Sequence, residues 1–442
     1  MLKKPAAYVL MISLTAALGG LLFGFDTAVI SGAIPYLQAE FKLDAAGLGW
    51  AVSCILIGCS LGAVLAGKLA DRYGRRTVLI ACALLFAVSG IGAGCAASLT
   101  IFVLFRLLGG LGVGAAALVS PMYIAETVPA GSRGRMVALY QMAIVSGMLL
   151  AYGTDALLAG RWRWMFASQA LPAAIFFGSL CFADESPRWL ISKGLLVRAL
   201  TVLKRTAPDA MAEVKQIQQS FQDHTPVHLY ELFKKPYARV VCTGIAIAVF
   251  QQASGINAVL YYAPVIFKQT GIAPGDALLQ TVLMGAVNVL ATLVAIVWVD
   301  RAGRKRFLVT GSILMGFCLL GLSACFYDQY FALYIVLALT LVYVAAFAAT
   351  LGAVTWVYLS EIFPNRVRGL ALSVATLALW LADFGVSAAF PLMNVHWGTA
   401  ITLLSYALCC GIAFLVFCYL PETKGRALEE MSHVFNQKIS TL

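Results

Sequence analysis

Long apolar runs alternate with short charged or turn-forming segments along the whole chain. Twelve such runs of about 20 residues begin near residues 8, 47, 77, 100, 136, 163, 238, 276, 306, 330, 369 and 398. An α-helix of this length crosses the hydrocarbon core of a bilayer. The pattern therefore predicts an all-α membrane protein with twelve transmembrane helices. The first run is longer than a signal-peptide core and lacks a cleavage site, so we expect it to be retained.

The longest polar segment, from about residue 184 to 239, separates six apolar runs from six. It is too short for a core-bearing domain, so we expect amphipathic helices there. The predicted organisation is an N-terminal six-helix half (1–184), cytoplasmic linker helices (185–237), a C-terminal six-helix half (238–421) and a cytoplasmic tail (422–442).

Composition agrees with a membrane protein, because 61% of the 442 residues are hydrophobic and 12% are charged, against roughly 25% charged in soluble proteins. The net charge of +11 does not indicate nucleic acid. With the N-terminus inside, 26 of the 31 Lys and Arg residues fall on the cytoplasmic side, as the positive-inside rule requires. The exceptions are Lys42, Arg161, Arg163 and Lys268 outside, and Arg106 within a run. Both termini are expected in the cytoplasm of a cell with an inner membrane.

Two motifs recur in the second half of the chain. DRYGRR after the second run returns as DRAGRK after the eighth, at an offset of 229 residues. Tyr123, Glu126 and Arg133 after the fourth run return as Tyr358, Glu361 and Arg368 after the tenth, at an offset of 235. Parallel six-helix repeats are the architecture of alternating-access transporters, which bind substrate near the midplane.

The repeated motifs carry opposite charges at helix ends expected on the cytoplasmic side. The carboxylates are Asp71, Glu126, Asp300 and Glu361, and the cations are Arg72, Arg75, Arg133, Arg301, Arg304 and Arg368. One such motif alone could be solvated loop charge. Its duplication favours a latch between helices that holds the outward-facing state closed on the cytoplasmic side.

Asp26 and Arg106 place opposite charges inside two apolar runs. A charge in a bilayer is tolerated when it is paired, and such residues usually mark a functional pathway. A static ion pair is the alternative, although small residues such as Gly109, Gly110 and Gly114 could pack two helices without charge. We therefore predict that protonation of Asp26 releases Arg106 and biases a two-state equilibrium.

Neutral polar and aromatic groups cluster at the start of the seventh run, and further amides and indoles lie within other runs. Any single Gln there could equally be a contact between helices. Together, amides and aromatic faces are what a sugar site requires. The candidates are Gln141, Gln251, Gln252, Asn257, Tyr261, Tyr262, Asn288, Trp356 and Trp380.

The sequence gives no support for an enzyme, a cofactor or a metal site. The four His residues all fall in loops or tails, which leaves no haem ligand or His relay in the membrane. The GxGxxA match at 112–117 and the GxSxG match at 58–62 lie inside apolar runs without a preceding strand.

The order of motifs resembles the sugar porters of the major facilitator superfamily, including the bacterial proton-coupled xylose symporters and the facilitative glucose transporters. The resemblance covers nearly the whole chain, from GGLLFGFDTAVISGA through RLLGGLGVG, ESPRWLISKG and QQASGINAVLYYAP to PETKGRALEEM. It implies two pseudo-symmetric six-helix halves, proton coupling at Asp26 with Arg106, and sugar contacts at Gln141, Gln251, Gln252, Asn257, Asn288, Trp356 and Trp380.

Several positions depart from that family. Met148 and Leu379 replace polar residues, Ala353 replaces a helix-kinking Pro, and Asp184 is a surface difference of no expected consequence. Asp383, three residues after Trp380, stands where Asn is common. It could bind a sugar hydroxyl, serve as a second proton site, or stay protonated as an ordinary hydrogen-bond donor.

Taken together, the sequence predicts a monomeric proton symporter that imports a monosaccharide such as D-xylose or D-glucose. A facilitative uniporter would share the fold and the sugar site without needing Asp26. A non-transporting sugar sensor is disfavoured because it usually carries a long signalling tail.

Overall fold

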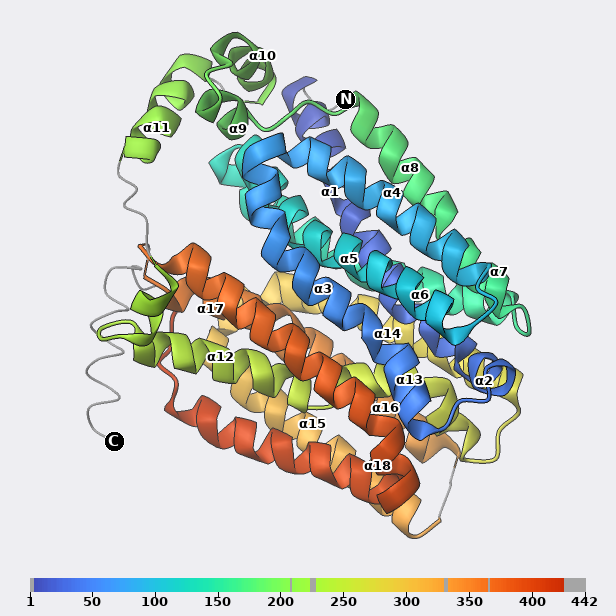
Figure 1. Cartoon of the computed structure of the whole chain (residues 1–442). Coiled ribbons are helices and arrows are strands. Elements are labelled where there is room, and N and C mark those ends of the chain that lie inside the picture. Colours follow the sequence, from blue (N-terminus) through green and yellow to red (C-terminus); the bar gives the residue numbers. More distant parts are fainter. Residues whose placement is uncertain (1–3, 207–208, 223–227, 330–332, 365, 425–442) are drawn as a thin grey trace. The chain divides into compact units, whose positions relative to one another are not determined.

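The structure is a computed structural model that describes residues 4–206, 209–222, 228–329, 333–364 and 366–424 (Figure 1). Every regular element within these ranges is a helix. The chain divides into two compact units, which are described separately below.

The first compact unit comprises Met1–Ile30, Cys54–Thr154 and Gly160–Thr225. Most of α3 (Ala45–Tyr73) and of α6 (Ala130–Leu157) belongs to it. Its other helices are α1 (Lys4–Ala28), α4 (Arg75–Gly94), α5 (Leu99–Thr127), α7 (Trp162–Ala167), α8 (Ala170–Phe182), α9 (Pro187–Ser192), α10 (Leu196–Thr206) and α11 (Ala210–Gln222).

The second compact unit comprises Ser31–Ser53, Asp155–Ala159 and Pro226–Leu442. Its helices are α2 (Ile30–Glu40), η1 (Leu229–Phe233), α12 (Ala238–Ala253), α13 (Ile256–Lys268), α14 (Pro274–Ala302), α15 (Arg304–Tyr327), α16 (Leu333–Phe347), the π-helix η2 (Ala348–Gly352), α17 (Ala353–Ile362) and α18 (Arg368–Tyr419). Two short pieces from the first half of the sequence thus cluster with the second unit. The division at residues 184, 237 and 421 stays a prediction, and residues 425–442 of the predicted tail lie outside the described residues.

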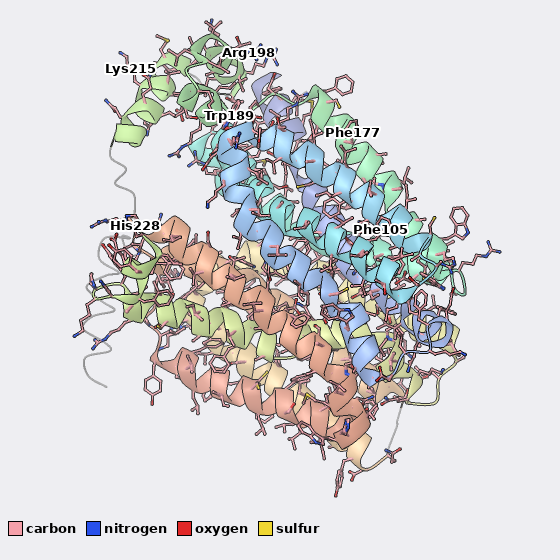
Figure 2. All side chains as sticks on the ribbon, viewed as in Figure 1. Phe105, Phe177, Trp189, Arg198, Lys215 and His228 are labelled. Atoms are coloured by element: carbon pink, nitrogen blue, oxygen red, sulfur yellow. The ribbon has the colours of Figure 1, made fainter. Side chains whose placement is uncertain are left out.

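The described residues contain eleven segments that are long and apolar enough to span a membrane. The last of them, α18, is two helices joined at Gly398, whose φ of 80° is not helical. This makes the twelve spans that the sequence predicts, and their starts agree with the predicted ones to within a few residues. Many apolar side chains on these helices are exposed, among them Phe177 on α8 (Figure 2), as expected for helices that face lipid.

Four of the spans are interrupted. α1 and α2 meet at Val29, α7 and α8 at Ser168 and Gln169, α12 and α13 at Ser254 and Gly255, and α16 and α17 are separated by η2. Ala353, which follows η2, replaces the Pro that is typical of the family, and this change predicts a weaker kink. The helix is nevertheless interrupted at η2. A π-helical turn is a common alternative cause of such an irregularity.

Glycines bring α3 and α5 into close contact in the first unit. A Cβ on Gly110 would collide with the Ile55 carbonyl oxygen, and one on Gly114 would collide with the Cys59 carbonyl oxygen. Small residues allow membrane helices to approach in this way. Tight packing around α5 fixes the position of Arg106, which lies one turn before Gly110.

The helices α9, α10 and α11 form a small separate core, built from Leu190, Ile191, Ala199, Val202, Leu203 and Val214. Their apolar residues recur on one face, as the amphipathic pattern of the polar segment predicts.

Candidate functional site

The Asp26 carboxyl and the Arg106 guanidinium form an ion pair within the first unit. Asp26 lies in the last turn of α1 and Arg106 lies on α5, and both side chains are completely buried. Arg106 Nη1 donates to Asp26 Oδ1 and also, over 3.0 Å, to the Asp26 carbonyl oxygen. A cation in this place is favourable for the C-terminal end of a helix. The structure therefore brings together the two residues that the sequence paired.

The ion pair uses only part of its hydrogen-bonding capacity. Asp26 Oδ2 and Arg106 Nε and Nη2 are buried without a hydrogen-bond partner among the described residues. The Arg106 guanidinium lies 5.4 Å from the centroid of the Phe166 ring, close enough for a cation–π contact. A pair with a single side-chain contact is weaker than a bidentate Arg–carboxylate pair, so a change at Asp26 can release it.

Gln169 is a neighbour of the ion pair that the sequence analysis missed. It lies at the interruption between α7 and α8, is completely buried, and its amide stands beside the Asp26 carboxyl. Its amide atoms make no hydrogen bond of good geometry with the described residues. A Cβ on Gly109 would lie 2.7 Å from Asp26 Oδ2, so glycine leaves the space that the carboxyl fills. A Gln within an apolar run was the available signal for this neighbour.

A second polar cluster lies within the second unit, where Asn257 joins Gln252 to Asp383. Asn257 Nδ2 donates to Gln252 Oε1 over 2.9 Å and to Asp383 Oδ2 over 2.7 Å. Ser387 Oγ donates to the other carboxyl oxygen, Asp383 Oδ1, over 3.1 Å. Both amide hydrogens of Asn257 are thus engaged, and its Oδ1 is the atom left to accept a hydrogen bond from a ligand.

The interruption between α12 and α13 presents these amides. Gly255 has a φ of +82°, and a Cβ there would collide with the Tyr406 ring, so both backbone and space require glycine. Tyr343 donates its hydroxyl hydrogen to the Ser254 carbonyl oxygen over 2.9 Å. On the preceding turn, Gln251 Nε2 donates over 2.9 Å to the Leu351 carbonyl oxygen in η2. Gln251 therefore connects two interrupted spans, and its Oε1 has no partner among the described residues.

The remaining sugar-site candidates are distributed over both units. Tyr262 donates to the Ser387 carbonyl oxygen over 3.2 Å and stacks on Phe390. Tyr261, Asn288 and Trp380 are buried in the second unit, whereas Trp356 is 38% exposed. Gln141 belongs to the first unit and is partly buried. The structure groups Gln251, Gln252, Asn257, Tyr262 and Asp383, and the role of the other candidates in the same site stays a prediction.

A charged network lies at the ends of α3, α4 and α5 in the first unit. Arg75 Nε lies 2.8 Å from Glu126 Oε2, and Ser186 Oγ donates to the same carboxyl over 2.5 Å. Glu185 caps α4, because its carboxyl accepts hydrogen bonds from the backbone amides of Arg75 and Arg76 at 2.9 and 3.1 Å. Burial raises the pKa of Glu185, whereas these backbone hydrogen bonds oppose the rise.

The second unit repeats this network residue by residue. Arg304 Nη2 lies 2.9 Å from Glu361 Oε1, and Thr423 Oγ1 donates to Glu361 Oε2 over 2.6 Å. Glu422 caps α15 by accepting from the backbone amides of Arg304 and Lys305. Glu185, Ser186, Glu422 and Thr423 are not among the predicted site residues, although the related segments ESPR and ETKG were the available signal.

Other members of the predicted charge set lie at the edge of these networks. Asp71 pairs with Arg75 over 3.1 Å but is 74% exposed, Arg72 lies over the Tyr73 ring, and Arg133 is exposed. Arg368 Nε donates to the Phe363 carbonyl oxygen over 3.3 Å. The side chains of Asp300 and Arg301 lie outside what the structure describes.

Asp184 corrects one expectation, because it is more than a surface difference. Its carboxyl accepts hydrogen bonds from the Tyr8 hydroxyl and from Arg205 Nη1, and its carbonyl oxygen accepts from the Tyr123 hydroxyl. An acidic residue there ties α1 and α10 to the end of α5, which a Pro side chain could not do.

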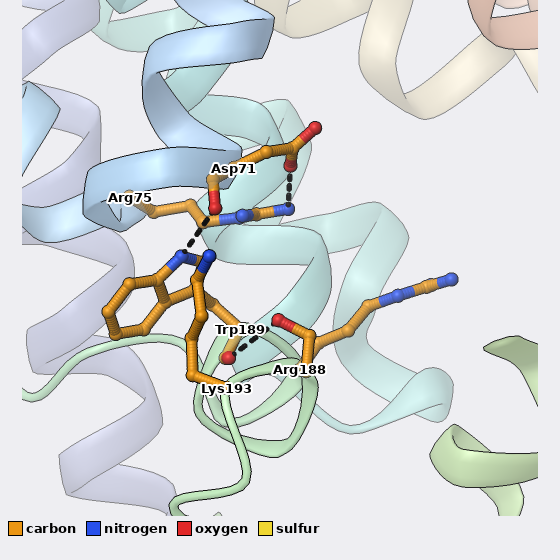
Figure 3. A pocket seen from close by; sticks show the side chains of 6 residues that line it. Asp71, Arg75, Arg188, Trp189 and Lys193 are labelled. Atoms are coloured by element: carbon orange, nitrogen blue, oxygen red, sulfur yellow. Dashed lines mark hydrogen bonds and ion pairs between the residues drawn. The ribbon is translucent and has the colours of Figure 1, made fainter.

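A polar cavity of about 340 Å³ lies beside the first network (Figure 3). Trp189 Nε1 donates to the Asp71 carbonyl oxygen over 3.0 Å at its wall. Within the described ranges, no group of three or more His, Cys, Asp or Glu side chains is arranged to hold a metal ion.

Comparison with known proteins gives consistent results. Residues 12–435 match the family model described as "Sugar (and other) transporter". The chain is 39% identical to a D-xylose-proton symporter of Escherichia coli strain K12, over 96% of this chain and 95% of that protein. It is also 39% identical to a glucose transport protein of Synechocystis sp., over 96% of this chain and 97% of that protein.

A solved structure of the Escherichia coli xylose transporter, in a partially occluded inward open conformation, matches the fold. The TM-score is 0.85 at 37% identity, over 95% of this chain and 100% of that chain. This match confirms the predicted fold, an all-α membrane protein with the two-halved major facilitator architecture.

Proposed function

The chain belongs to the sugar transporter family, and on this premise we propose that it imports a monosaccharide together with protons by alternating access. It is a multi-pass membrane transporter and not an enzyme. Similar proteins are named for D-xylose and for glucose, so D-xylose and D-glucose are the candidate substrates. The buried Asp26–Arg106 pair is the observation that carries proton coupling, because a uniporter has no need of it.

The pair couples proton binding to conformation through the α1–α5 contact. While Asp26 is ionised, it compensates the buried Arg106 charge and links the two helices. A proton on Asp26 removes that charge and leaves Arg106 with the Asp26 carbonyl oxygen and the Phe166 ring. The protonation state therefore changes the relative stability of two conformations, which is what symport requires.

Sugar recognition is proposed for the amide cluster of the second unit together with Gln141, Asn288, Trp356, Trp380 and Tyr261. Asn257 Oδ1 and Gln251 Oε1 are available acceptors for sugar hydroxyls. Asp383 positions Asn257, because its Oδ2 accepts a hydrogen bond from the Asn257 amide. Met148 and Leu379 are buried hydrophobic residues at their positions.

The charged networks are proposed to act as the cytoplasmic latch that the sequence predicts. Each network fixes the helix ends of its own unit through one partly buried Arg–Glu pair and one capping Glu. We further propose that the protein is a monomer in a cell inner membrane with both termini in the cytoplasm. The asymmetric distribution of Lys and Arg supports this orientation.

Asp26→Asn should abolish accumulation of sugar while preserving exchange. The neutral side chain cannot exchange a proton, but the rest of the sugar pathway is intact. The measurement is uptake of labelled D-xylose and D-glucose into proteoliposomes with and without an inward proton gradient, followed by counterflow without a gradient. Asp276→Asn, which changes an exposed carboxylate at the start of α14, is the matched control. Accumulation retained in Asp26→Asn would reject this assignment and leave a static ion pair.

Asp383→Asn should weaken sugar binding about tenfold, which corresponds to about 1.4 kcal/mol. The new amide can place a donor against the Asn257 donor and turn that side chain. Binding would be measured by tryptophan fluorescence at several pH values. Ser387→Ala, which removes only the second hydrogen bond to Asp383, should have a smaller effect. If affinity and its pH dependence are the same in Asp383→Asn as in wild type, Asp383 neither positions the site nor binds protons.

Glu361→Gln should shift the balance between outward-facing and inward-facing states about tenfold, equivalent to about 1.4 kcal/mol. The change leaves the Arg304 charge without its carboxylate partner. Accessibility of single engineered cysteines to a membrane-impermeant reagent reports the two states, with Asp276→Asn again as control. Unchanged accessibility and unchanged transport rate would disprove the latch.

A further inference from the structure

Asp155 is a buried carboxyl group that none of the roles above uses. It lies near the C-terminal end of α6, and only 1% of its surface is exposed. Its Oδ2 accepts a hydrogen bond of 3.0 Å from the Gly32 backbone amide. Its Oδ1 has no partner among the described residues.

Within the described ranges, the surroundings of Asp155 contain no compensating charge, whereas Asp26 has a cation beside it. Apart from burial, the Gly32 amide is the only group in this part of the chain that acts on the Asp155 carboxyl. The ionisable side chains on the neighbouring elements are Tyr36 and Glu40 on α2, Tyr152 on α6, and Tyr261, Tyr262 and Lys268 on α13.

The Gly32 amide belongs to the first turn of α2, which begins at Ile30 after the interruption at Val29. Amides in a first turn have no partner within their helix, and the helix end favours a negative charge. The contact is close, because a Cβ on Gly32 would lie 2.5 Å from Asp155 Cβ and 2.6 Å from its Oδ2. A charge-assisted hydrogen bond and a helix end thus oppose the cost of burying the charge. The hydrogen bond and the helix end stabilise the ionised form within the buried site, whereas the unpartnered Oδ1 can hold a proton, so both protonation states have a structural basis.

We propose that Asp155 is a second proton-binding site, separate from Asp26, at the junction of α2 and α6. A proton from solvent adds to Oδ1, and the ionised form binds the Gly32 amide more strongly than the neutral form. Deprotonation therefore tightens the attachment of α2 to α6, and protonation loosens it.

The site is also connected to the helix that carries Asn257. Ser31, next to Gly32, donates its hydroxyl hydrogen to the Leu260 carbonyl oxygen of α13 over 3.3 Å. If α13 binds sugar, which rests on the proposed function, protonation of Asp155 changes sugar affinity, and sugar changes proton affinity by the same factor.

The direct test is infrared titration of the full-length protein in detergent, comparing wild type with Asp155→Asn. The wild type should show a carboxyl band that titrates across neutral pH and is missing in Asp155→Asn. Glu40→Gln, at the exposed far end of α2, is the control and should retain the band. Identical titrations in wild type and Asp155→Asn would overturn the proposal. Since this measurement needs no sugar, it fails or succeeds independently of the transport function.

Gly32→Ala provides a second variant that keeps the carboxyl. Its methyl group displaces Asp155 from the amide, so the titration midpoint of the band should move to higher pH by about one unit, a tenfold change in proton affinity. A midpoint that stays at the wild-type pH would contradict the role of the α2 amide. In binding assays with D-xylose, Asp155→Asn should flatten the pH dependence of affinity, while counterflow assays show whether sugar exchange itself persists.

Discussion

A carboxylate and a guanidinium that are both shut off from water inside a membrane span can persist only beside each other. The cost of either charge alone in that environment is at least a few kcal/mol. In this protein Asp26 and Arg106 meet that constraint with one side-chain contact, one contact to a backbone carbonyl and an aromatic face. The close packing of α3 against α5 and the absence of a side chain at Gly109 give the pair its space. A pair held in this way is stable while both charges exist. When a proton binds to Asp26, the carboxyl becomes neutral and no longer compensates the Arg106 charge.

Interrupted helices are the second consequence of placing polar groups in a membrane. Irregular backbone is tolerated there only where its polar groups find partners or line a cavity. All four interruptions contain or adjoin polar residues of the candidate site or of its surroundings. The α1–α2 interruption follows Asp26, the α12–α13 interruption separates Gln252 from Asn257, and η2 accepts the hydrogen bond from Gln251. The fourth interruption contains Gln169, which stands beside Asp26.

Features that depend on neighbouring residues in the sequence could be predicted, and features that depend on contacts between distant residues could not. The twelve spans follow from run length, and the Asp26–Arg106 pair follows because Arg106 is the only Lys or Arg deep within an apolar run. By contrast, Asn257 and Asp383 are 126 residues apart, and nothing in either segment specified that an amide and a carboxyl would meet. The related segments ESPR and ETKG indicate that Glu185 and Glu422 correspond, but they do not show that each caps a helix that begins more than 100 residues away. Asp155 is a carboxylate within an apolar run, but the sequence cannot show its partner, because that partner is a backbone amide.

The central claim is that the Asp26–Arg106 pair makes sugar movement carry protons. The most direct measurement is the internal pH of proteoliposomes, read with an enclosed dye, after sugar is added outside in the absence of any pH gradient. The account predicts that D-xylose or D-glucose acidifies the interior of vesicles containing the wild type and that vesicles containing Asp26→Asn exchange the same sugar with no change in pH. Entry of sugar into wild-type vesicles without acidification would contradict it.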